Sequence, residues 1–282
     1  PYVIAKELKK YHFDAAVLFK NSFASAAAVF LARIPVRVGY SREWRGVMLT
    51  ERLRPERLSG GKFKPVSMVT YYLNLAERVG ADISERSLVL RVDPEEVRKV
   101  TRMFPELCSS RVPLAVLVPG GAFGPSKCWA AERFAAIADW LVEKYEAVVV
   151  VSVAPNEQEK EIARKICSAS HFKLINLGER PLSMGQLKGL LGLSDVVLCN
   201  DTGPRHIAIA MKKNVVTLFG PNDPAWTDTG YEGETKIVAD VKCAPCQRPE
   251  CTETDHWCMK SISVETVKDA ISRILARRRR PV

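Results

Sequence analysis

The sequence predicts an α/β protein of two domains, each built on a parallel sheet covered by helices. The first observation is five apolar runs in the second part of the chain, at Leu114–Val118, Ala147–Val153, Leu174–Leu177, Val196–Cys199 and Val215–Phe219. Helical patterns separate these runs, at Ala131–Lys144, Gln158–Ala169, Met184–Leu191 and from Pro204 onward. Strands that are apolar throughout and alternate with helices indicate a parallel sheet buried on both faces. The second observation is the length of 282 residues, which is enough for two domains of ordinary size.

The first part of the chain shows the same alternation with shorter runs. A helix at Val3–Lys10 and a strand at Ala15–Phe19 lead into a polar turn, Lys20–Ser22, and an alanine-rich helix to Ala32. The next elements are expected in the order strand, strand, helix, strand and helix, at Val36–Gly39, Val47–Leu49, Val66–Val79, Leu88–Val92 and Asp93–Phe104. Because the pattern breaks around Phe104–Pro113, we expect the domains to be residues 1–108 and 109–282.

Composition limits the classes of function. The hydrophobic share of 47% is typical of a globular protein, and no apolar run reaches the roughly 18–20 residues of a membrane span. No signal peptide is visible, so we expect a cytoplasmic, reducing environment for the eight cysteines. The net charge of +10 is concentrated in two places. The stretch Arg33–Lys64 contains nine Lys or Arg but only three Glu, and the chain ends in an arginine-rich tail. Such clusters favour acidic partners: nucleic acid, anionic lipid or a phosphorylated substrate.

The stretch Asp195–Phe219 reads as a β–α–β unit with a candidate anion site. Its first strand ends in a polar turn, Asn200–Gly203, and Pro204 suits the first turn of the helix that follows. Asp201 or Thr202 could cap that helix. A helix that starts at the carboxyl end of a strand, with a glycine and an imidazole (His206) beside it, is suited to binding an anion.

Other loops at the same sheet edge add to this site. The glycine-rich loop Pro119–Lys127 contains Gly120 and Gly121, which let the backbone approach a phosphate, and Lys127 adds a positive charge. Glu157 and Glu159 begin the next helix, where a carboxylate can hold ribose hydroxyls. A fourth loop, Gly220–Pro224, has its shape fixed by two prolines. Together these loops predict a site for a nucleotide diphosphate.

Three of these motifs closely resemble glycosyltransferase family 9. They are Pro-Gly-Gly-x-x-Gly-Pro-Ser-Lys-x-Trp (Pro119–Trp129), Asn-Asp-Thr-Gly-Pro-Arg-His (Asn200–His206) and Leu-Phe-Gly-Pro-Asn-Asp-Pro (Leu218–Pro224). Within the family the chain is most similar to the lipopolysaccharide heptosyltransferases of type II, whose cysteine-rich tail resembles Cys243–Met259. The resemblance covers the second domain and extends more loosely into the first.

The resemblance implies a GT-B architecture: two Rossmann-like domains facing a cleft, with ADP-heptose bound by the second domain. It further implies transfer of heptose to the phosphorylated lipid A-core, with inversion and without a required cofactor, by an enzyme in peripheral contact with the inner membrane. Lys127 would stabilise the leaving diphosphate. The donor-binding residues would be Gly120, Gly121, Lys127, Glu159, Asp201, Thr202, Gly203 and His206, with Glu157 as a rival to Glu159. The acceptor-binding residues would be Asn21, Ser22 and Arg37.

The start of the chain departs from the family pattern. Family members begin with a strand and a Gly-Asp loop that carries the presumed catalytic aspartate, and we expect that segment to precede Pro1, so that this chain is a fragment or a processed chain. One alternative function is therefore a nucleotide-sugar-binding module that is catalytically incomplete. A nucleic-acid-binding function ranks last, because the basic region offers only Tyr40, Trp44 and Phe63 for stacking on bases.

The cysteine pattern of the tail allows a metal site. Cys243, Cys246, Cys251 and Cys258, with His256 among them, have spacings compatible with tetrahedral zinc. A cysteine-rich surface hairpin without metal is the equal alternative. A structural zinc ion is therefore one of two expectations for this segment.

Overall fold

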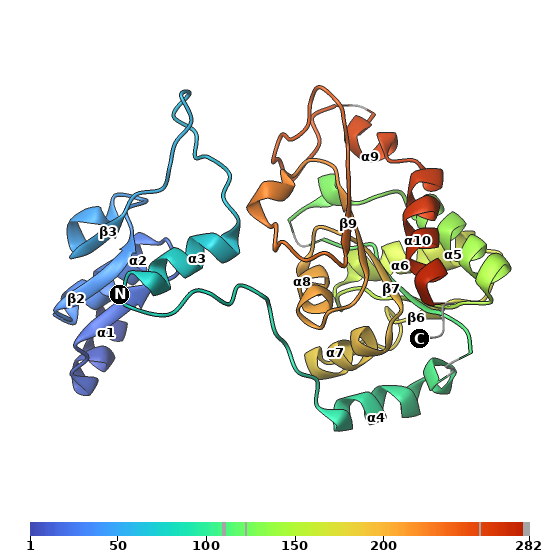
Figure 1. Cartoon of the computed structure of the whole chain (residues 1–282), viewed down its shortest axis with the longest axis horizontal. Helices are drawn as coiled ribbons and strands as arrows, with labels where there is room; N and C mark the ends of the chain where they lie inside the picture. Colours follow the sequence, from blue (N-terminus) through green and yellow to red (C-terminus); the bar gives the residue numbers. More distant parts are fainter. Residues whose placement is uncertain (109–110, 122, 254, 279–282) are drawn as a thin grey trace. The chain divides into compact units, whose positions relative to one another are not determined.

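The computed structural model describes residues 1–108, 111–121, 123–253 and 255–278, which form two compact units (Figure 1). The first unit contains Pro1–Arg86 and the short segment Ala225–Thr229, and the second contains Ser87–Pro224 and Gly230–Val282. The domain boundary expected between 108 and 109 falls at residues 109–110, which lie outside the described residues. The chain passes into the second unit earlier, because helix α4 (Pro94–Met103) packs against α7 (Met184–Leu193) and buries Val100 in that unit's core.

A three-stranded parallel sheet, in the order β1-β2-β3, forms the centre of the first unit. Ser22 starts the alanine-rich helix by accepting a hydrogen bond from the Ser25 N–H (3.2 Å), as an N-cap serine does. The small side chains Ala26 and Ala27 let this helix pack closely on the sheet. The elements are α1 (Tyr2–Leu8), β1 (Ala15–Leu18), α2 (Phe23–Leu31), β2 (Val36–Tyr40), β3 (Glu51–Leu53) and α3 (Met68–Glu77), with 3₁₀ turns at Lys9–Tyr11 and Arg45–Met48.

Two strands expected in the first part of the chain are not strands. The run Val47–Leu49 lies largely in the 3₁₀ turn Arg45–Met48, whose Met48 is buried under α2, and the strand follows at β3 instead. The run Leu88–Val92 is extended but outside both sheets, and the Val89 side chain is 66% exposed. This run lies at the start of the second unit, where Leu90 N–H donates to the carbonyl of Ala210 (3.1 Å). An apolar run in an extended connection looks like a strand in sequence, which explains the wrong prediction.

The second unit is built on a six-stranded parallel sheet in the order β6-β5-β4-β7-β8-β9. Counted within this unit, that order is 3-2-1-4-5-6, the order of a doubly wound Rossmann sheet. The predicted parallel α/β fold is confirmed here, although β9 and α10 were not anticipated. The strands are β4 (Leu114–Val118), β5 (Val148–Val151), β6 (Ile175–Asn176), β7 (Val196–Asn200), β8 (Val215–Phe219) and β9 (Glu234–Val238). The remaining helices are α5 (Ala131–Tyr145), α6 (Glu157–Ala169), α8 (Gly203–Ala210), α9 (Trp257–Ser261) and α10 (Val264–Arg278), with 3₁₀ turns at Pro105–Cys108, Pro125–Lys127 and Pro224–Trp226.

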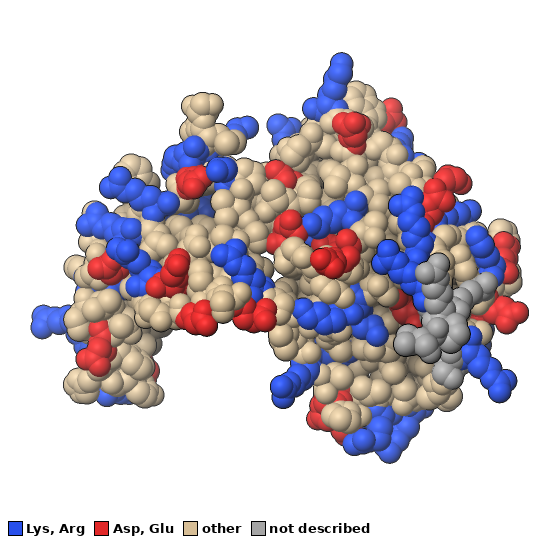
Figure 2. Space-filling view, in the orientation of Figure 1, with Lys and Arg blue, Asp and Glu red and all other residues tan. Residues whose placement is uncertain are grey.

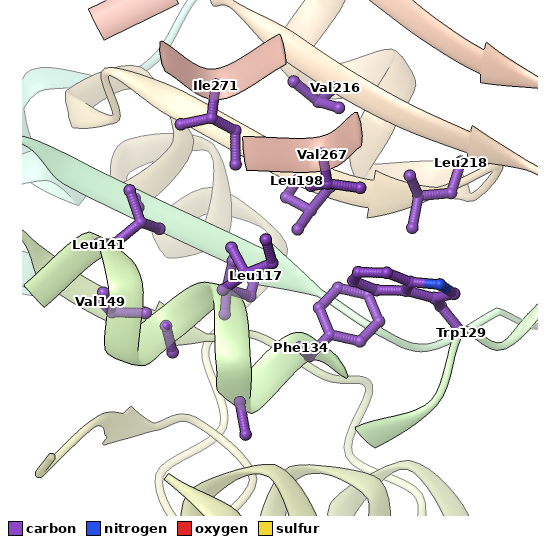
Figure 3. Packing of buried hydrophobic residues seen from close by; sticks show 14 of the residues in the cluster. Leu117, Trp129, Phe134, Leu141, Val149, Leu198, Val216, Leu218, Val267 and Ile271 are labelled. Carbon is purple, nitrogen blue, oxygen red and sulfur yellow. The ribbon is translucent and has the colours of Figure 1, made fainter. Parts of the chain in front are cut away.

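Helices cover both faces of this sheet. On one face α5, α6 and α10 pack against alternate strand residues, and Figure 3 shows Val267 and Ile271 of α10 over Leu198 and Val216 of the sheet. Trp129 and Phe134 close the end of this core, with their rings edge to face at 5.3 Å. On the other face α4, α7 and α8 form the second layer. In a parallel sheet covered on both faces, ligands bind at the carboxyl ends of the strands.

Charge is mixed on the surface. In Figure 2, Lys and Arg side chains of both units are interspersed with Asp and Glu. The basic stretch Arg33–Lys64 lies entirely in the first unit. None of the described helices is long and apolar enough to cross a bilayer.

Candidate functional site

The site lies where the strand order of the second sheet reverses. Strand β4 has β5 on one side and β7 on the other, so the connections after β4 and β7 leave in opposite directions and open a crevice at the carboxyl ends. The Asn200 amide, at the end of β7, donates to the carbonyl of Pro119 (2.6 Å), at the end of β4. The glycine-rich loop and the Asn200–Gly203 turn, predicted separately from sequence, are thus joined at this point.

Lys127 and Asp201 form a buried ion pair across the crevice. The Lys127 ammonium donates to the Asp201 carboxylate and to the Asp201 carbonyl, both at 3.0 Å, and only 8% of Lys127 is exposed. Burial by itself raises the pKa of Asp201, but Lys127, the Asn222 amide (3.0 Å) and Arg205 outweigh it, so that the pKa of this carboxyl is lowered. A lysine is rarely buried unless it is paired. This pair therefore fixes the ammonium at a defined place beside the glycine-rich loop.

Arg205 and Glu234 extend the pair into a chain of buried charges. Both side chains are fully buried, and Arg205 binds the Glu234 carboxylate through Nε (2.6 Å) and Nη2 (3.0 Å). Arg205 Nη1 also reaches Asp201 (3.2 Å), and the Thr217 hydroxyl donates to Glu234 (2.6 Å). A buried ion pair contributes little unless its remaining hydrogen bonds are made, and here they are. Asp201 is thus held by Arg205 on one carboxylate oxygen and by Lys127 on the other.

Arg205, Glu234 and Asn222 were not among the residues predicted for the site. Arg205 of α8 stands four residues after Asp201, which lies just before the helix, and a spacing of four between opposite charges could have been noticed. Asn222 lies within the quoted motif Leu218–Pro224 but was given no role. Nothing in the sequence pattern pointed to Glu234 as a site residue, because it lies on β9, a strand that the pattern did not predict.

The N-terminus of α8 faces this network. Thr202 occupies the N-cap position, and its side chain makes no capping hydrogen bond among the described residues. The cap expected from Thr202 is therefore not formed by its side chain, while the Asp201 carboxylate, two residues before the helix, binds Lys127. A helix N-terminus of this kind is suited to an anion. Burial and then the nearby Arg205 lower the pKa of His206, so its imidazole is neutral at pH 7.

The two candidate glutamates have different surroundings. Glu159 accepts from the Ala154 N–H (2.8 Å), and a Cβ placed on Gly120 would lie 2.1 Å from its carboxylate, so Glu159 packs against the glycine-rich loop. Only glycine at position 120 allows that approach. Glu157 instead binds Arg164 along the exposed side of α6, and this hydrogen bond lowers its pKa. Gly121 lies against the side chain of Lys127.

In the first unit, Asn21 and Ser22 are separated from Arg37. Asn21 follows β1 and accepts hydrogen bonds from Arg45 (2.9 Å) and from the Tyr71 hydroxyl (3.1 Å). Arg37 lies near the start of β2, where its guanidinium donates to backbone carbonyls that include Met48 O (2.7 Å). Ser22 caps α2. The structure thus does not bring the three predicted acceptor residues together, and it places the fully buried Arg45 beside Asn21 instead.

The four cysteines of the tail lie near one another, since burial and then the other three raise the pKa of Cys258. Cys243 is half-buried, Cys246 and Cys251 are exposed and Cys258 is buried. Among the described residues no group of three or more His, Cys, Asp or Glu is placed to hold a metal ion.

Burial raises the pKa of Cys199, at the end of β7, to about 12, so this thiol stays protonated and acts as a small apolar side chain.

Comparison with known proteins gives a consistent family. The sequence model of "Glycosyltransferase family 9 (heptosyltransferase)" matches residues 2–256. Lipopolysaccharide heptosyltransferase 2 of Salmonella typhimurium is 31% identical over 231 residues, which are 79% of this chain and 64% of that protein. Lipopolysaccharide heptosyltransferase 2 of Escherichia coli is 29% identical over 279 residues, which are 96% of this chain and 78% of that protein. The chain thus spans less than two thirds of the Salmonella relative.

Solved structures show the same fold. E. coli ADP-heptose lps heptosyltransferase II matches with a TM-score of 0.74 at 22% identity, over 98% of this chain and 80% of that one. A glycosyl transferase of family 9 from Veillonella parvula matches with a TM-score of 0.78 at 18% identity, over 97% of this chain and 78% of that one. The fold class predicted from the sequence, an α/β fold of the GT-B type, is confirmed by these neighbours.

Proposed function

The chain belongs to glycosyltransferase family 9, and from this premise we propose that it transfers heptose from ADP-heptose to the inner core of lipopolysaccharide. The observation that carries the proposal is the buried Lys127–Asp201 pair beside the N-terminus of α8, at the switch point of a Rossmann sheet. A diphosphate bound there would meet a fixed ammonium and the positive end of the α8 helix dipole at once. Among the described residues, Asp201 takes two of the three N–H bonds of Lys127, and the ammonium also lies over the Phe123 ring, 4.7 Å from its centroid. Among these contacts, a phosphate oxygen would compete only with the ring for the third N–H.

In the proposed reaction an acceptor hydroxyl attacks the anomeric carbon of the heptose, and the bond from that carbon to the diphosphate oxygen breaks. The attack from the face opposite ADP inverts the configuration. Negative charge then grows on the ADP, where Lys127 and the N-terminus of α8 are already in position to stabilise it. Because these groups supply the positive charge, we propose that no metal is essential. The proton of the hydroxyl goes to a carboxylate base, the role that the family resemblance gives to the aspartate of a Gly-Asp loop.

Donor recognition follows from the remaining contacts. We propose that Glu159 holds the ribose hydroxyls, since it lies against the glycine-rich loop, whereas Glu157 is engaged with Arg164. Gly120 and Gly121 would bring backbone close to the diphosphate, and Thr202, Gly203 and His206 would line it. The buried oxygens Asn200 Oδ1 and Asn222 Oδ1 have no hydrogen-bond donor among the described residues, and sugar hydroxyls or water could satisfy both.

The first unit offers a basic pocket for an acidic acceptor. A cavity of about 200 Å³ is lined by Arg42, Arg54, Lys64 and Glu56, which pairs with Lys64 (2.7 Å), so that two arginines carry its excess positive charge. We propose that this pocket receives a phosphate or carboxylate of the lipid A-core. We further propose that Asn21 and Ser22, which follow the carboxyl end of β1, also contact the acceptor. The same basic surface would favour peripheral contact with anionic lipid at the inner membrane. Arg37, which is held by backbone carbonyls, would support the sheet rather than bind the acceptor.

Two measurements test this function. Calorimetry should show that ADP binds the chain and that UDP binds more weakly, and a chelator should not change the ADP affinity. A transfer assay with ADP-heptose and lipid A-core acceptors with and without a first heptose, using the full-length protein, should yield a heptosylated product from at least one of them. Equal binding of ADP and UDP, or no product, would contradict the proposal.

A further inference from the structure

The cysteine-rich segment Cys243–Cys258 contacts the loop that carries Lys127. Ser126, the residue before Lys127, has all three of its polar groups bonded to this segment. Its N–H donates to the carbonyl of Pro249 (3.1 Å), and its hydroxyl donates to the carbonyl of Arg248 (2.6 Å). Its own carbonyl accepts from His256 Nε2 (2.6 Å), which must carry the proton because a carbonyl can only accept. Ser126 is 3% exposed, so these bonds are largely shielded from water.

Close packing accompanies the hydrogen bonds. Gly124 has a φ of +148°, and a Cβ at this position would lie 2.3 Å from the carbonyl oxygen of Pro249. The loop therefore reaches the segment only because residue 124 is glycine. The same segment also binds the loop after β8, since the Gln247 N–H donates to the carbonyl of Pro221 (2.8 Å). The loop after β4 and the loop after β8 are thus both hydrogen-bonded to the cysteine-rich segment.

The contacts lie within the cysteine pattern. Gln247, Arg248 and Pro249 stand between Cys246 and Cys251, and His256 stands two residues before Cys258. Ser126 and Lys127 share the 3₁₀ turn Pro125–Lys127, so the position of Ser126 determines where the Lys127 side chain starts. Lys127 must then reach Asp201 on another loop with its Nζ.

We propose that Ser126 and His256 are positioning residues of the donor site: the cysteine-rich segment holds the turn through them, so that Lys127 is preorganised for the diphosphate. The proposal rests on the proposed function, because it takes the diphosphate of the donor as the ligand of Lys127. It gives the cysteine-rich segment a role that requires no metal. A group held in place before binding loses less conformational freedom when the ligand arrives, which raises affinity.

A double-mutant cycle with ADP tests the proposal. His256→Ala removes one neutral hydrogen bond to the turn, and ADP affinity measured by calorimetry should fall about 2- to 10-fold. His256→Gln, which can still donate an N–H, should recover most of the loss. In a Lys127→Ala background, His256→Ala should have no further effect, because its influence passes through the lysine. An equal loss in both backgrounds, or none in the wild type, would overturn the proposal.

The matched control is Thr252→Ala in the same segment. The Thr252 hydroxyl accepts from Arg248 Nη1 (2.9 Å) and is exposed, so this variant removes a bond to the Arg248 side chain, whereas the turn is bonded to the Arg248 backbone carbonyl. It should leave ADP affinity unchanged.

Hydrogen exchange separates this proposal from the proposed function. The amides of Ser126 and Lys127 should exchange faster in His256→Ala and at the wild-type rate in Thr252→Ala, with or without ADP. If ADP fails to bind the wild type while exchange still responds to His256→Ala, the proposed donor is wrong and the positioning contact stands. Unchanged exchange at Ser126 would refute the positioning contact itself.

Discussion

Among the described residues each unit contains one fully buried arginine, and the two have different hydrogen-bond partners. Arg205 of the second unit is bonded to the carboxylates of Glu234 and Asp201, and although burial lowers its pKa, Glu234 and Asp201 raise it overall. Arg45 of the first unit is bonded to neutral acceptors: the Tyr40 carbonyl (2.8 Å), the Lys20 carbonyl and the Asn21 amide oxygen (2.9 Å). Burial lowers the pKa of Arg45.

The two units therefore differ in whether a buried positive charge is paired with buried carboxylates. In the second unit, charges of both signs alternate from Lys127 through Asp201 and Arg205 to Glu234, so the positive groups are held in fixed positions by buried partners. In the first unit, the buried positive charge of Arg45 lies beside a loop and the remaining Lys and Arg are largely exposed. The second arrangement suits a ligand bound in one geometry, and the first suits a charged partner that is attracted at longer range.

The largest expected effect is on stability, from removing Arg205. Arg205→Met would leave Glu234 and Asp201 as buried carboxylates without this partner, and the free energy of unfolding should fall by about 3–5 kcal/mol. Arg45→Met leaves only neutral acceptors short of a donor, so its cost should be about 1–3 kcal/mol. Both values are measured by denaturant unfolding.

Two further variants serve as controls for this prediction. Arg205→Met combined with Glu234→Met should recover much of the loss, because an apolar pair replaces the lone buried charge. Arg164→Met, which breaks only exposed ion pairs on α6, should leave unfolding unchanged. If Arg205→Met and Arg45→Met lowered the free energy of unfolding equally, the carboxylate partners of Arg205 would add nothing to the cost of removing a buried arginine.

These two arginines also mark the limit of what the sequence could predict. The runs that form β4, β5, β7 and β8 are apolar throughout, and the loops after them carry glycine, proline and capping residues, so the sheet and the edge of the site followed from local pattern. For Arg205 the local pattern offered only the spacing of four from Asp201, and other partners of the two arginines come from segments distant in sequence: Glu234 on β9, and Lys20 and Asn21 after β1. Local pattern carries no information about such pairings.

The next effect is on ligand binding, from removing Lys127. Lys127→Ala should weaken ADP binding by roughly 1.5–3 kcal/mol, the value of a hydrogen bond to a charged group. Lys144→Ala, an exposed lysine in the last turn of α5, is the matched control and should bind ADP as the wild type does. Calorimetry measures both. An unchanged affinity in Lys127→Ala would remove this residue from the donor site.

A smaller effect concerns pH and His206. Because burial and Arg205 lower its pKa in the folded state, the unfolded chain binds the proton more readily. The free energy of unfolding should therefore decrease as the pH falls below about 6.5, the ordinary pKa of histidine, by at most about 1.4 kcal/mol per pH unit from this group. His206→Gln cannot bind that proton, so its stability should decrease less between pH 6.5 and pH 5. Parallel curves for the two proteins would show that His206 does not contribute.

The smallest expected effect belongs to the exposed charges of the first unit. Arg54 lines the basic pocket but is exposed, so its attraction for a phosphorylated acceptor acts through water and is screened by salt. Arg54→Ala should weaken binding of a soluble phosphorylated core fragment only about 2- to 5-fold at low salt, consistent with less than about 1 kcal/mol for an exposed charge. The difference should vanish near 0.5 M salt, whereas the loss caused by Lys127→Ala, a buried group, should persist there for ADP. Titrations of both variants at two salt concentrations check this contrast. A salt-resistant loss in Arg54→Ala would mean that this pocket also binds its ligand in one fixed geometry, and the two units would then not differ in the way their buried arginines indicate.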